Sequence, residues 1–371
     1  MILWILLLIF IGVLGLGALF YLVTRVRRFS FMRRLAKEHK ALSWLLAIAA
    51  VGLLFLFAFV NLYAVVIVVL HLALIWLICD LVAWIVRRIR KTEPKRYLAG
   101  VIALLLTAIY LGAGWIAAHH IRQTNYTVGT QKTTEPLRIV LIADSHLGIT
   151  LDGDGFRETM ERIQSTEPDL AVVVGDFVDD DSDKADMEEA CRALGSLQTT
   201  YGVYYVYGNH DNGYFQSRDF TAADLKTSLT QNGVTILEDE TVLLGEQYAL
   251  LGRKDRSMPD RLPIDALLSD TERYTIVLDH QPNDYDAEAV AGADLVLSGH
   301  THGGHIFPAG LIGLWTGAND ATYGLSHRAD TTFIITSGLS GWAIPFKTGC
   351  FSEYVVIDIR SFLIRSFLPI P

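Results

Sequence analysis

Four apolar segments in the first third of the chain set the strongest limit on its fold. They span Ile2–Thr24, Ala41–Val60, Leu62–Val86 and Tyr97–Ala118. Each is close to the ~20 residues that an α-helix needs to cross a bilayer. Because four such segments follow one another, membrane spans are favoured over buried helices of a soluble core. We therefore predict a four-helix transmembrane region over residues 1–118.

The distribution of basic residues predicts the orientation of these spans. The first loop carries seven Lys and Arg residues between positions 25 and 40, and the third carries six between positions 87 and 96, whereas the turn at Asn61 carries none. The positive-inside rule places loops one and three in the cytoplasm. Both termini, and everything after residue 118, are then expected on the extracytoplasmic side of a cell membrane.

The remainder of the chain has the composition of a water-soluble and strongly acidic domain. Of the 31 basic and 40 acidic residues, 18 and 37 follow residue 118, which gives this part a formal charge near −19. Because neutralisation of phosphates dominates nucleic-acid affinity, this charge predicts that nucleic acid is not a partner. We expect a polar linker over residues 119–136 and a domain over residues 137–371. Its alternation of strand-like and helical segments predicts a layered α/β domain with a mixed sheet.

Five short polar motifs in this domain each follow a strand-like apolar run. They are Asp144-Ser145-His146, Gly175-Asp176, Gly208-Asn209-His210-Asp211, His280 and Gly299-His300-Thr301-His302. Side chains at the ends of neighbouring strands converge on one edge of an open α/β sheet. In extended backbone, residues two apart, such as Asp144 and His146, point to the same side. This mixture of carboxylates, imidazoles and an amide suits a pair of divalent first-row metals.

Taken singly, each motif is weak evidence, because a lone buried histidine is more often a hydrogen-bonded core residue than a ligand. The five motifs together, each at a strand end, favour a metal site over that structural interpretation. The acidic run Asp179–Asp181 is interpreted as a solvated loop, with a supporting role for Asp179 as the alternative.

From about Leu137 to Ile359 the chain resembles the calcineurin-like metallophosphoesterases. Within them it is most similar to the membrane-associated bacterial branch related to the YkuE and YaeI phosphodiesterases. The resemblance rests on the five motifs and on a late segment from Ser337 to Glu353, and it covers about 60% of the chain. It implies an α/β (α+β layered) fold, namely a four-layer αββα metallophosphoesterase sandwich, preceded here by the four-helix transmembrane region.

The resemblance also implies a dinuclear centre of divalent ions, either Mn, Fe or Zn. One ion would take Asp144, His146, Asp176 and His302, and the other Asp176, Asn209, His280 and His300, so that Asp176 bridges the two. His210 would contact the phosphate and protonate the leaving oxygen, and Asp211 would orient His210. The chain has His305 where this branch usually has Gln, and Lys347 where Arg is common. These departures are expected to affect substrate choice rather than activity.

Together these features predict a membrane-anchored phosphoric ester hydrolase, a phosphodiesterase or phosphatase, that acts through a hydroxide activated by two metal ions. The expected substrate is a phosphodiester linked to a lipid or to the cell envelope, because the anchor keeps the site near the bilayer. Two alternatives stay open: a polytopic membrane sensor whose outer domain binds a phosphoryl ligand, and a protein phosphatase. The apolar segments Leu311–Trp315, Gly341–Phe346 and Phe362–Pro371 are expected either to enter the membrane interface or to pack internally.

Overall fold

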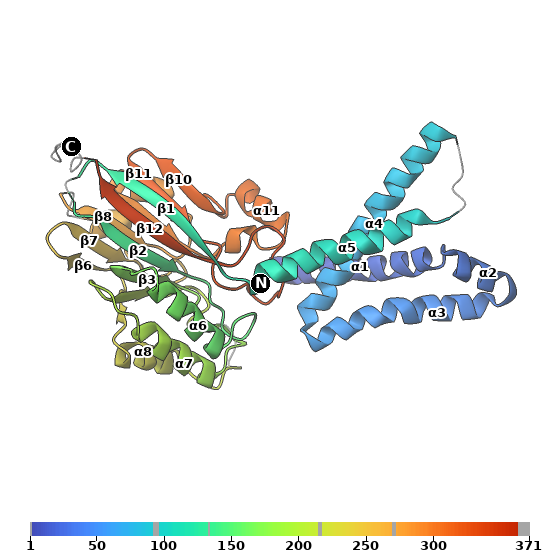
Figure 1. Cartoon of the computed structure of the whole chain (residues 1–371), viewed down its shortest axis with the longest axis horizontal. Coiled ribbons are helices and arrows are strands. Elements are labelled where there is room, and N and C mark those ends of the chain that lie inside the picture. Colours follow the sequence, from blue (N-terminus) through green and yellow to red (C-terminus); the bar gives the residue numbers. More distant parts are fainter. Residues whose placement is uncertain (1, 92–95, 133, 214–216, 269–271, 363–371) are drawn as a thin grey trace. The chain divides into compact units, whose positions relative to one another are not determined.

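The computed structural model describes residues 2–91, 96–132, 134–213, 217–268 and 272–362 (Figure 1). The chain divides into two compact units, Met1–Ala113 and Gly114–Pro371. The division falls inside helix α5 (Leu98–His119), before residue 118, the predicted end of the transmembrane region. The last turns of this long apolar helix therefore belong to the second unit.

The first unit is helical. Its elements are α1 (Ile2–Val26), α2 (Ser30–Glu38), α3 (Lys40–Gly52), the 3-10 helix η1 (Leu53–Phe59), α4 (Leu62–Arg90) and most of α5. By length and composition, four helical segments can cross a membrane, and they coincide with the four predicted spans: Ile9–Val26, Lys40–Phe59, Leu62–Arg90 and Leu98–His119. The short polar helix α2, which the sequence analysis did not anticipate, occupies the predicted first loop.

A carboxylate within α4 is compensated by its neighbours in the first unit. Asp80 Oδ2 lies 2.9 Å from Arg25 Nε and 3.2 Å from Arg28 Nη1. Its other oxygen accepts a hydrogen bond of 2.7 Å from the hydroxyl of Tyr97, which itself accepts one of 2.8 Å from Trp76 Nε1. A charge in an apolar helix is costly unless it is paired, so these contacts give Asp80 a structural role.

The second unit contains two six-stranded sheets. The first has the order β1 (Arg122–Thr130), β12 (Glu353–Ser361), β2 (Leu137–Ile142), β3 (Leu170–Val174), β4 (Val203–Val206), β5 (Thr235–Ile236). The second has the order β10 (Gly324–Arg328), β11 (Thr331–Ile335), β9 (Leu295–Ser298), β8 (Tyr274–Leu278), β7 (Tyr248–Gly252), β6 (Glu240–Leu244). Strands β2 to β5 and β11, β9, β8 and β7 run parallel, whereas β12 with β2, β10 with β11 and β6 with β7 are antiparallel. The predicted mixed sheet is confirmed.

The two sheets stack through a shared apolar core, and helices cover their outer faces. Inner-face residues such as Ile139, Val172, Ile276 and Leu297 are fully buried between the sheets. Helices α6 (Gly153–Gln164), α7 (Lys184–Gly195) and α8 (Ala222–Gln231) pack on the first sheet, and α9 (Ile264–Leu267) and α10 (Tyr285–Ala291) on the second. Because both faces of the central strands are covered, strands such as β3 and β8 are buried along their whole length. This arrangement is the predicted αββα sandwich (Figure 1).

The prediction of a linker over residues 119–136 was wrong for its middle part. Residues Arg122–Thr130 form strand β1, which pairs in parallel with β12 over nine residue pairs from Arg122–Glu353 to Thr130–Ser361. Strand β1 lies at the edge of the sheet, so most of its side chains face solvent and its sequence is polar. Its partner lies more than 200 residues further along the chain, which no local pattern reveals.

Candidate metal centre

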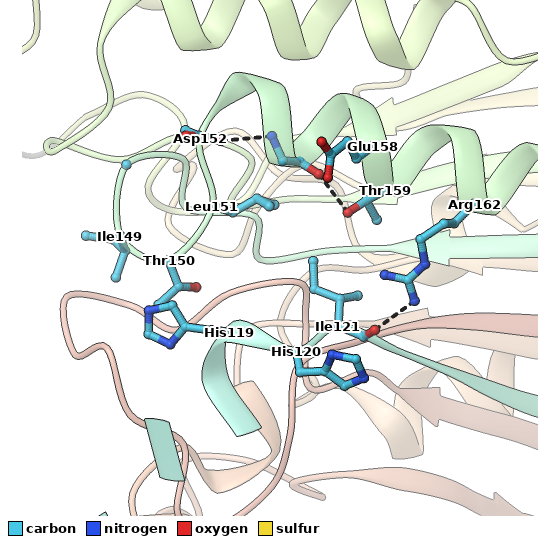
Figure 2. A pocket seen from close by; sticks show the side chains of 12 residues that line it. His119, His120, Ile121, Ile149, Thr150, Leu151, Asp152, Glu158, Thr159 and Arg162 are labelled. Atoms are coloured by element: carbon cyan, nitrogen blue, oxygen red, sulfur yellow. Dashed lines mark hydrogen bonds between the residues drawn. The ribbon is translucent and has the colours of Figure 1, made fainter. Parts of the chain in front are cut away.

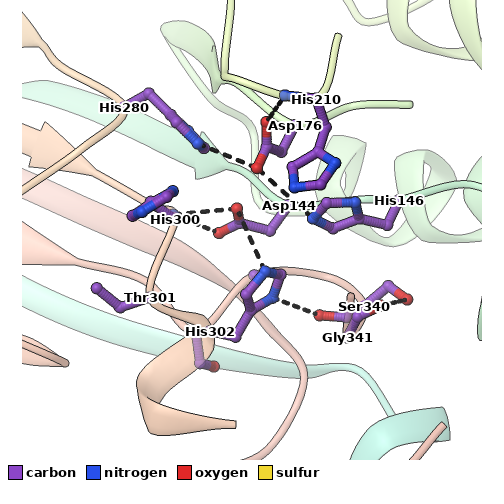
Figure 3. Close-up of polar contacts among 12 residues, drawn as sticks. Asp144, His146, Asp176, His210, His280, His300, Thr301, His302, Ser340 and Gly341 are labelled. Atoms are coloured by element: carbon purple, nitrogen blue, oxygen red, sulfur yellow. Dashed lines mark hydrogen bonds and ion pairs between the residues drawn. The ribbon is translucent and has the colours of Figure 1, made fainter. Parts of the chain in front are cut away.

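The five polar motifs meet where strands of both sheets end. Asp144, Asp176 and Asn209 follow β2, β3 and β4, and His280 and His300 follow β8 and β9. Three groups of potential metal ligands result: Asp144 with His146 and His302, Asp176 with His280 and His300, and His146 with Asp179 and His210. The first two contain only predicted ligands, and we refer to them as the two ligand groups. Within each group the potential ligand atoms lie within 4.8 Å of one another. Figure 3 shows the carboxylates and imidazoles pointing toward a common centre.

Asp176 lies between the two groups. Its Oδ2 atom is 3.1 Å from His280 Nε2 in one group and 3.7 Å from His146 Nε2 in the other. Its Oδ1 atom accepts a hydrogen bond of 2.8 Å from the backbone N–H of His210, which fixes the carboxylate (Figure 3). One oxygen of Asp176 therefore faces both groups, as a bridging ligand must.

The imidazole rings of His280 and His146 are each fixed by a contact of Nδ1, on the side of the ring away from the site. His280 Nδ1 lies 2.8 Å from the carbonyl oxygen of Val174, a contact that also ties the two sheets together. His146 Nδ1 lies 3.0 Å from Asp179 Oδ2. Histidine ligands of metals commonly donate their second ring N–H in this way, which fixes the ring and its tautomer. The Nε2 atoms are thereby directed into the site.

Two of the nitrogens directed inward are buried without a hydrogen-bond partner among the described residues. They are Nε2 of His146 and Nδ1 of His300, whereas Nε2 of His280 faces Asp176 Oδ2 at 3.1 Å. Buried polar atoms in folded proteins are almost always satisfied, so two orphaned nitrogens beside two buried carboxylates require an explanation. Divalent metal ions supply one, because imidazole nitrogens and carboxylate oxygens are their usual ligands. The residues present therefore fit a dinuclear centre.

The electrostatics of the site favour positive charge beside Asp176. Burial would raise the pKa of Asp176, but the charge of His280 outweighs it and holds that pKa well below its usual range. Conversely, burial would lower the pKa of His280, and the carboxylate of Asp176 instead raises it well above its usual value. Burial raises the pKa of Asp144 to about 6, against the lowering effect of His280. A divalent cation would displace the shared proton and compensate both carboxylates.

Two further imidazoles are kept neutral near pH 7. Burial, together with the charge of His280, lowers the pKa of His300 to about 4. Burial also lowers the pKa of His302 well below its usual value. Because metals bind the neutral form of histidine, both rings have a lone pair available for coordination at physiological pH.

The backbone at the predicted ligands is not extended. The side-chain alternation of extended backbone, from which we expected Asp144 and His146 to point to the same side, therefore does not apply. Asp144, His146, Asp176, His300 and His302 have φ angles of 50°, 36°, 52°, 70° and 49°. Residues other than glycine rarely adopt this left-handed region, and such strained residues cluster at functional sites. The side chains predicted from strand alternation do meet, but through tight turns after each strand.

Glycines at two of the motifs allow the close approach. Gly175 has a φ of +77°, and a Cβ atom there would lie 2.5 Å from His280 Nδ1. A Cβ atom on Gly208 would lie 2.3 Å from Asp176 Oδ1. Any larger residue at either position would push a predicted ligand out of place.

Asn209 lies on the rim beside a polar pair that the sequence analysis missed. Its Oδ1 atom accepts a hydrogen bond of 3.3 Å from Gln281 Nε2, which also donates one of 3.0 Å to Asp255 Oδ2. This contact holds the amide group of Asn209 at the rim of the site. In the sequence, only the position of Gln281 directly after His280 could have indicated that Gln281 lies at the site.

Two carboxylates make contacts that the sequence analysis did not include. Asp211, which we expect to orient His210, accepts hydrogen bonds from backbone amides in the β3 and β4 loops, namely those of Asp176 (3.0 Å), Phe177 (2.9 Å), Val178 (3.2 Å) and Gly208 (2.7 Å). It therefore fastens these two loops together. Asp179, expected in a solvated loop, is buried and holds His146, so its alternative supporting role is the one its contacts favour.

The two departures from the family pattern lie behind the first ligand group. The ring centroid of His305 is 5.4 Å from that of His302. Lys347 is buried, and its Nζ donates to the carbonyl oxygens of Ser337 (2.6 Å) and Gly338 (3.2 Å). Because Gly338 packs against the side chain of Asp144, Lys347 is linked through Gly338 to a predicted ligand.

The second unit contains a pocket of about 460 Å³ (Figure 2). It is lined by the end of α5, the loop after His146 and helix α6, with His119, His120, Thr150, Leu151, Glu158 and Arg162 among its residues. The pocket and the centre share a wall, because Thr150 Oγ1 lies 2.6 Å from Ser340 Oγ and the Ser340 carbonyl oxygen is 3.3 Å from His302 Nδ1. It offers space next to the centre that the ligand residues do not fill.

Comparison with known proteins identifies the family. A family model for calcineurin-like phosphoesterases matches residues 137–304. An uncharacterized metallophosphoesterase of Aquifex aeolicus is 31% identical over 270 residues, which cover 69% of this chain and 98% of the relative. The chain belongs to the calcineurin-like metallophosphoesterases. The resemblance to this family deduced from the five motifs is confirmed, and with it the hydrolase class of the fold.

Other relatives of this metallophosphoesterase differ in length. An uncharacterized metallophosphoesterase of Helicobacter pylori is 34% identical over 226 residues, and the chain spans only 58% of its length, with 58% of the chain covered. YkuE of Bacillus subtilis, an uncharacterized metallophosphoesterase, is 25% identical over 289 residues, covering 73% of the chain and 99% of YkuE. A protein of Bos taurus named transmembrane protein with metallophosphoesterase domain is 28% identical over 311 residues, covering 76% of the chain and 68% of the relative.

Proposed function

We propose that the chain is a membrane-anchored phosphoesterase that holds two divalent ions between its two sheets and hydrolyses a phosphodiester linked to a lipid or to the envelope. The observation that carries this proposal is the position of Asp176, whose Oδ2 atom faces imidazole nitrogens of both ligand groups. The unpartnered nitrogens of His146 and His300 near it support the same conclusion.

The ligands are assigned from the family resemblance, and their grouping in the structure supports the assignment in part. Asp144, His146, Asp176 and His302 would hold the first ion, and Asp176, Asn209, His280 and His300 the second; Asp144, His146 and His302 lie together, as do Asp176, His280 and His300. A pair of divalent ions supplies Lewis acidity toward phosphoryl oxygens and lowers the pKa of water toward neutrality. Mn, Fe and Zn all accept this ligand set. The chain contributes the fixed geometry, through Asp179 behind His146 and Gln281 behind Asn209.

His210 is the residue we assign to the substrate. Its ring centroid is 5.1 Å from that of His146 and 5.4 Å from that of Trp342, so it borders the centre on its open side. Burial lowers the pKa of His210, which leaves the ring neutral near pH 7. A neutral ring can donate one N–H to a phosphoryl or leaving oxygen, and it can pass a proton to the leaving group only after gaining one. Asp211 contributes indirectly by fastening the loops that carry Asp176 and His210.

The membrane arrangement follows from the helices and the loop charges. Four helices are long and apolar enough to cross a membrane. We propose that all four span it and that the basic loops between positions 25 and 40 and between 87 and 96 are cytoplasmic. The metallophosphoesterase domain then works on the extracytoplasmic side. The name of the Bos taurus relative, a transmembrane protein, agrees with a membrane-anchored domain.

The proposal is tested with the full chain in lipid nanodiscs. Hydrolysis of bis-p-nitrophenyl phosphate and of p-nitrophenyl phosphate is measured with Mn²⁺ and after EDTA, for the wild type, His210→Ala, Asn209→Ala and the matched control His327→Ala on strand β10. We expect turnover that depends on Mn²⁺, is faster for the diester, is lost in the two site variants and is retained in the control. Absence of turnover with two ions bound would favour a sensor that binds a phosphoryl ligand.

A further inference from the structure

Helix α11 (Ala309–Thr316) exposes an unusual number of large apolar side chains. Its sequence contains no charged residue, and none of its eight residues is buried. With its flanking residues it presents a surface that we call the α11 surface, made of Phe307, Leu311, Ile312, Leu314, Trp315 and Trp342. Trp315 is 80% exposed and Ile312 is 54% exposed. A contiguous apolar surface of this kind on a folded domain marks a contact with a partner or a membrane.

The α11 surface is fastened to the end of a membrane-length helix. The backbone N–H of Lys347 donates to the carbonyl oxygen of Gly114 in α5 at 2.9 Å. The next residue, Thr348, accepts a hydrogen bond of 3.0 Å through its Oγ1 from the backbone N–H of Phe307, where the α11 surface begins. The surface is therefore separated from the last turns of α5 by only two hydrogen-bonded residues.

Aromatic and backbone contacts reinforce this link within the second unit. The ring centroids of Trp115 in α5 and Phe346 lie 5.5 Å apart. The carbonyl oxygens of Ala117 and Ala118 accept hydrogen bonds of 2.8 Å from the N–H and hydroxyl of Ser352. Tryptophans near the ends of spanning helices commonly lie at the membrane–water interface. The α11 surface thus begins where the chain leaves the apolar layer.

The same surface reaches the metal centre. Trp342 is partly exposed, and its ring centroid is 5.4 Å from that of His210. The segment Leu311–Trp315 lies within α11, which has no buried residue. The segment Gly341–Phe346 contributes the exposed Trp342 beside His210, whereas its Phe346 is buried. In the third segment Phe362 is exposed, and positions 363–371 lie outside the described residues.

We propose that the α11 surface lies in the bilayer interface and delivers phosphate esters of membrane-resident amphiphiles to the metal centre. An apolar face with aromatic side chains inserts at the boundary between headgroups and acyl chains, and its binding grows with the apolar area buried. The ester group of such a substrate would stand at His210 while its chain stays in the leaflet beside Trp342. This delivery function rests on the proposed phosphoesterase activity, whereas the insertion itself does not.

Insertion is tested with spin labels on the full chain. Cys79, Cys191 and Cys350 are replaced, single cysteines are introduced as Ile312→Cys and Trp315→Cys, and the labelled protein is placed in nanodiscs of phosphatidylethanolamine and phosphatidylglycerol. Leu243→Cys and Val290→Cys are matched controls, because both are apolar and more than half exposed on other faces of the same unit. We expect labels at 312 and 315 to collide with oxygen more than with a water-soluble nickel complex, and labels at 243 and 290 to show the reverse.

Two results would overturn the insertion. Equal access of the nickel complex to all four labels would place the α11 surface in water. Shielding of labels 312 and 315 from both reagents would show that a protein, such as a second copy of the chain, covers the surface instead.

Delivery is tested with two diesters that differ only in their chain, dodecyl and methyl p-nitrophenyl phosphate. We expect the double variant Ile312→Asp/Trp315→Asp to lower the ratio of dodecyl to methyl kcat/KM by about tenfold or more, because the loss of even one large apolar contact with the dodecyl chain is worth about that factor. Leu243→Asp/Val290→Asp should keep the wild-type ratio. An unchanged ratio in the first variant would overturn the delivery function. A wild type that cleaves neither ester would contradict the phosphoesterase activity. In that case the spin-label experiment alone would decide whether the α11 surface inserts.

Discussion

Two buried groups of carboxylates lie side by side at the end of strand β8, and they are compensated in different ways. Asp279, the first residue after β8, has its Oδ2 atom 2.8 Å from Arg253 Nη1. The next residue, His280, belongs to the metal centre, where Asp176 faces imidazoles. In the first group the positive charge is a permanent part of a side chain, whereas in the second it depends on protons or on bound ions. The difference separates a structural cluster from the site that we propose to hold metal.

The arginine cluster is nevertheless crowded with negative charge. Arg253 Nη1 also lies 2.7 Å from Asp284 Oδ2 and 3.2 Å from Glu288 Oε1. Burial, followed by the charge of Asp279, raises the pKa of Glu288 well above its usual value. Glu288 therefore remains protonated above the pH at which an exposed glutamate ionises, and the cluster needs no outside cation.

The largest difference between the two groups should appear when one carboxylate of each is replaced. We expect Asp176→Asn to lower kcat/KM for bis-p-nitrophenyl phosphate by about 10³-fold or more, since it removes the residue placed to bridge both ions. Asp284→Asn, in the arginine cluster, should stay within about twofold of the wild type. Steady-state kinetics at saturating Mn²⁺ measures both. An Asp176→Asn enzyme with more than a tenth of wild-type activity would contradict the assignment.

Stability should respond in the opposite way. Removing one member of a buried ion-pair cluster costs about 3–5 kcal/mol, so Arg253→Met should lower the unfolding midpoint strongly. Arg360→Met, whose side chain is largely exposed, should change stability by less than about 0.5 kcal/mol. Thermal unfolding of the full chain in detergent, followed by tryptophan fluorescence, tests the pair. If added Mn²⁺ abolished the difference in midpoint between Arg253→Met and the wild type, the two groups would not be independent.

Metal removal should affect only the centre at Asp176. A ligand present at about 100 times its Kd stabilises the folded state by about 2.7 kcal/mol. We therefore expect EDTA to lower the unfolding midpoint of the wild type and of Arg253→Met, and Mn²⁺ to restore it in both. Asp176→Asn should lose most of this response. A wild-type midpoint that is the same with EDTA and with Mn²⁺ would count against bound metal.

The smallest effect concerns the pH dependence of the arginine cluster. Folding raises the pKa of the Glu288 carboxyl group. The contribution of this group to the free energy of unfolding is therefore fully present below the pKa of the unfolded state, about 4.3, and is lost as the pH rises through the pKa of the folded state. Glu288→Gln removes this loss, so its stability relative to the wild type should increase between pH 5 and pH 8 by on the order of 1 kcal/mol. The exposed control Glu161→Gln should show no such trend. A relative stability that falls with pH would reverse the predicted sign.

Much of the metal centre could be predicted from the sequence because its ligands follow apolar strands. The run before Asp176 and the run before His300 are buried strands, and the end of such a strand places its next polar residue at the sheet edge. The four apolar segments were equally clear, since their length and composition suffice to define them. In both cases the signal is local along the chain.

Features that depend on distant partners could not be predicted. Strand β1 was taken for a linker because an edge strand needs few apolar residues and its partner is β12. The role of Asp179 depends on its approach to His146, and that of Asp211 on four amides from two loops. The left-handed backbone at Asp144 is also absent from any residue pattern, because non-glycine residues adopt it only when surrounding contacts impose it.

Counting the bound ions tests the central claim most directly. The full chain is loaded with Mn²⁺, freed of excess metal and analysed by inductively coupled plasma mass spectrometry, together with His302→Ala, His300→Ala and the control His327→Ala. Two ions that share Asp176 predict about two Mn per chain for the wild type and the control, and a lower content for each site variant. A wild type that retains no ion, or site variants that retain as much metal as the wild type, would contradict the dinuclear centre.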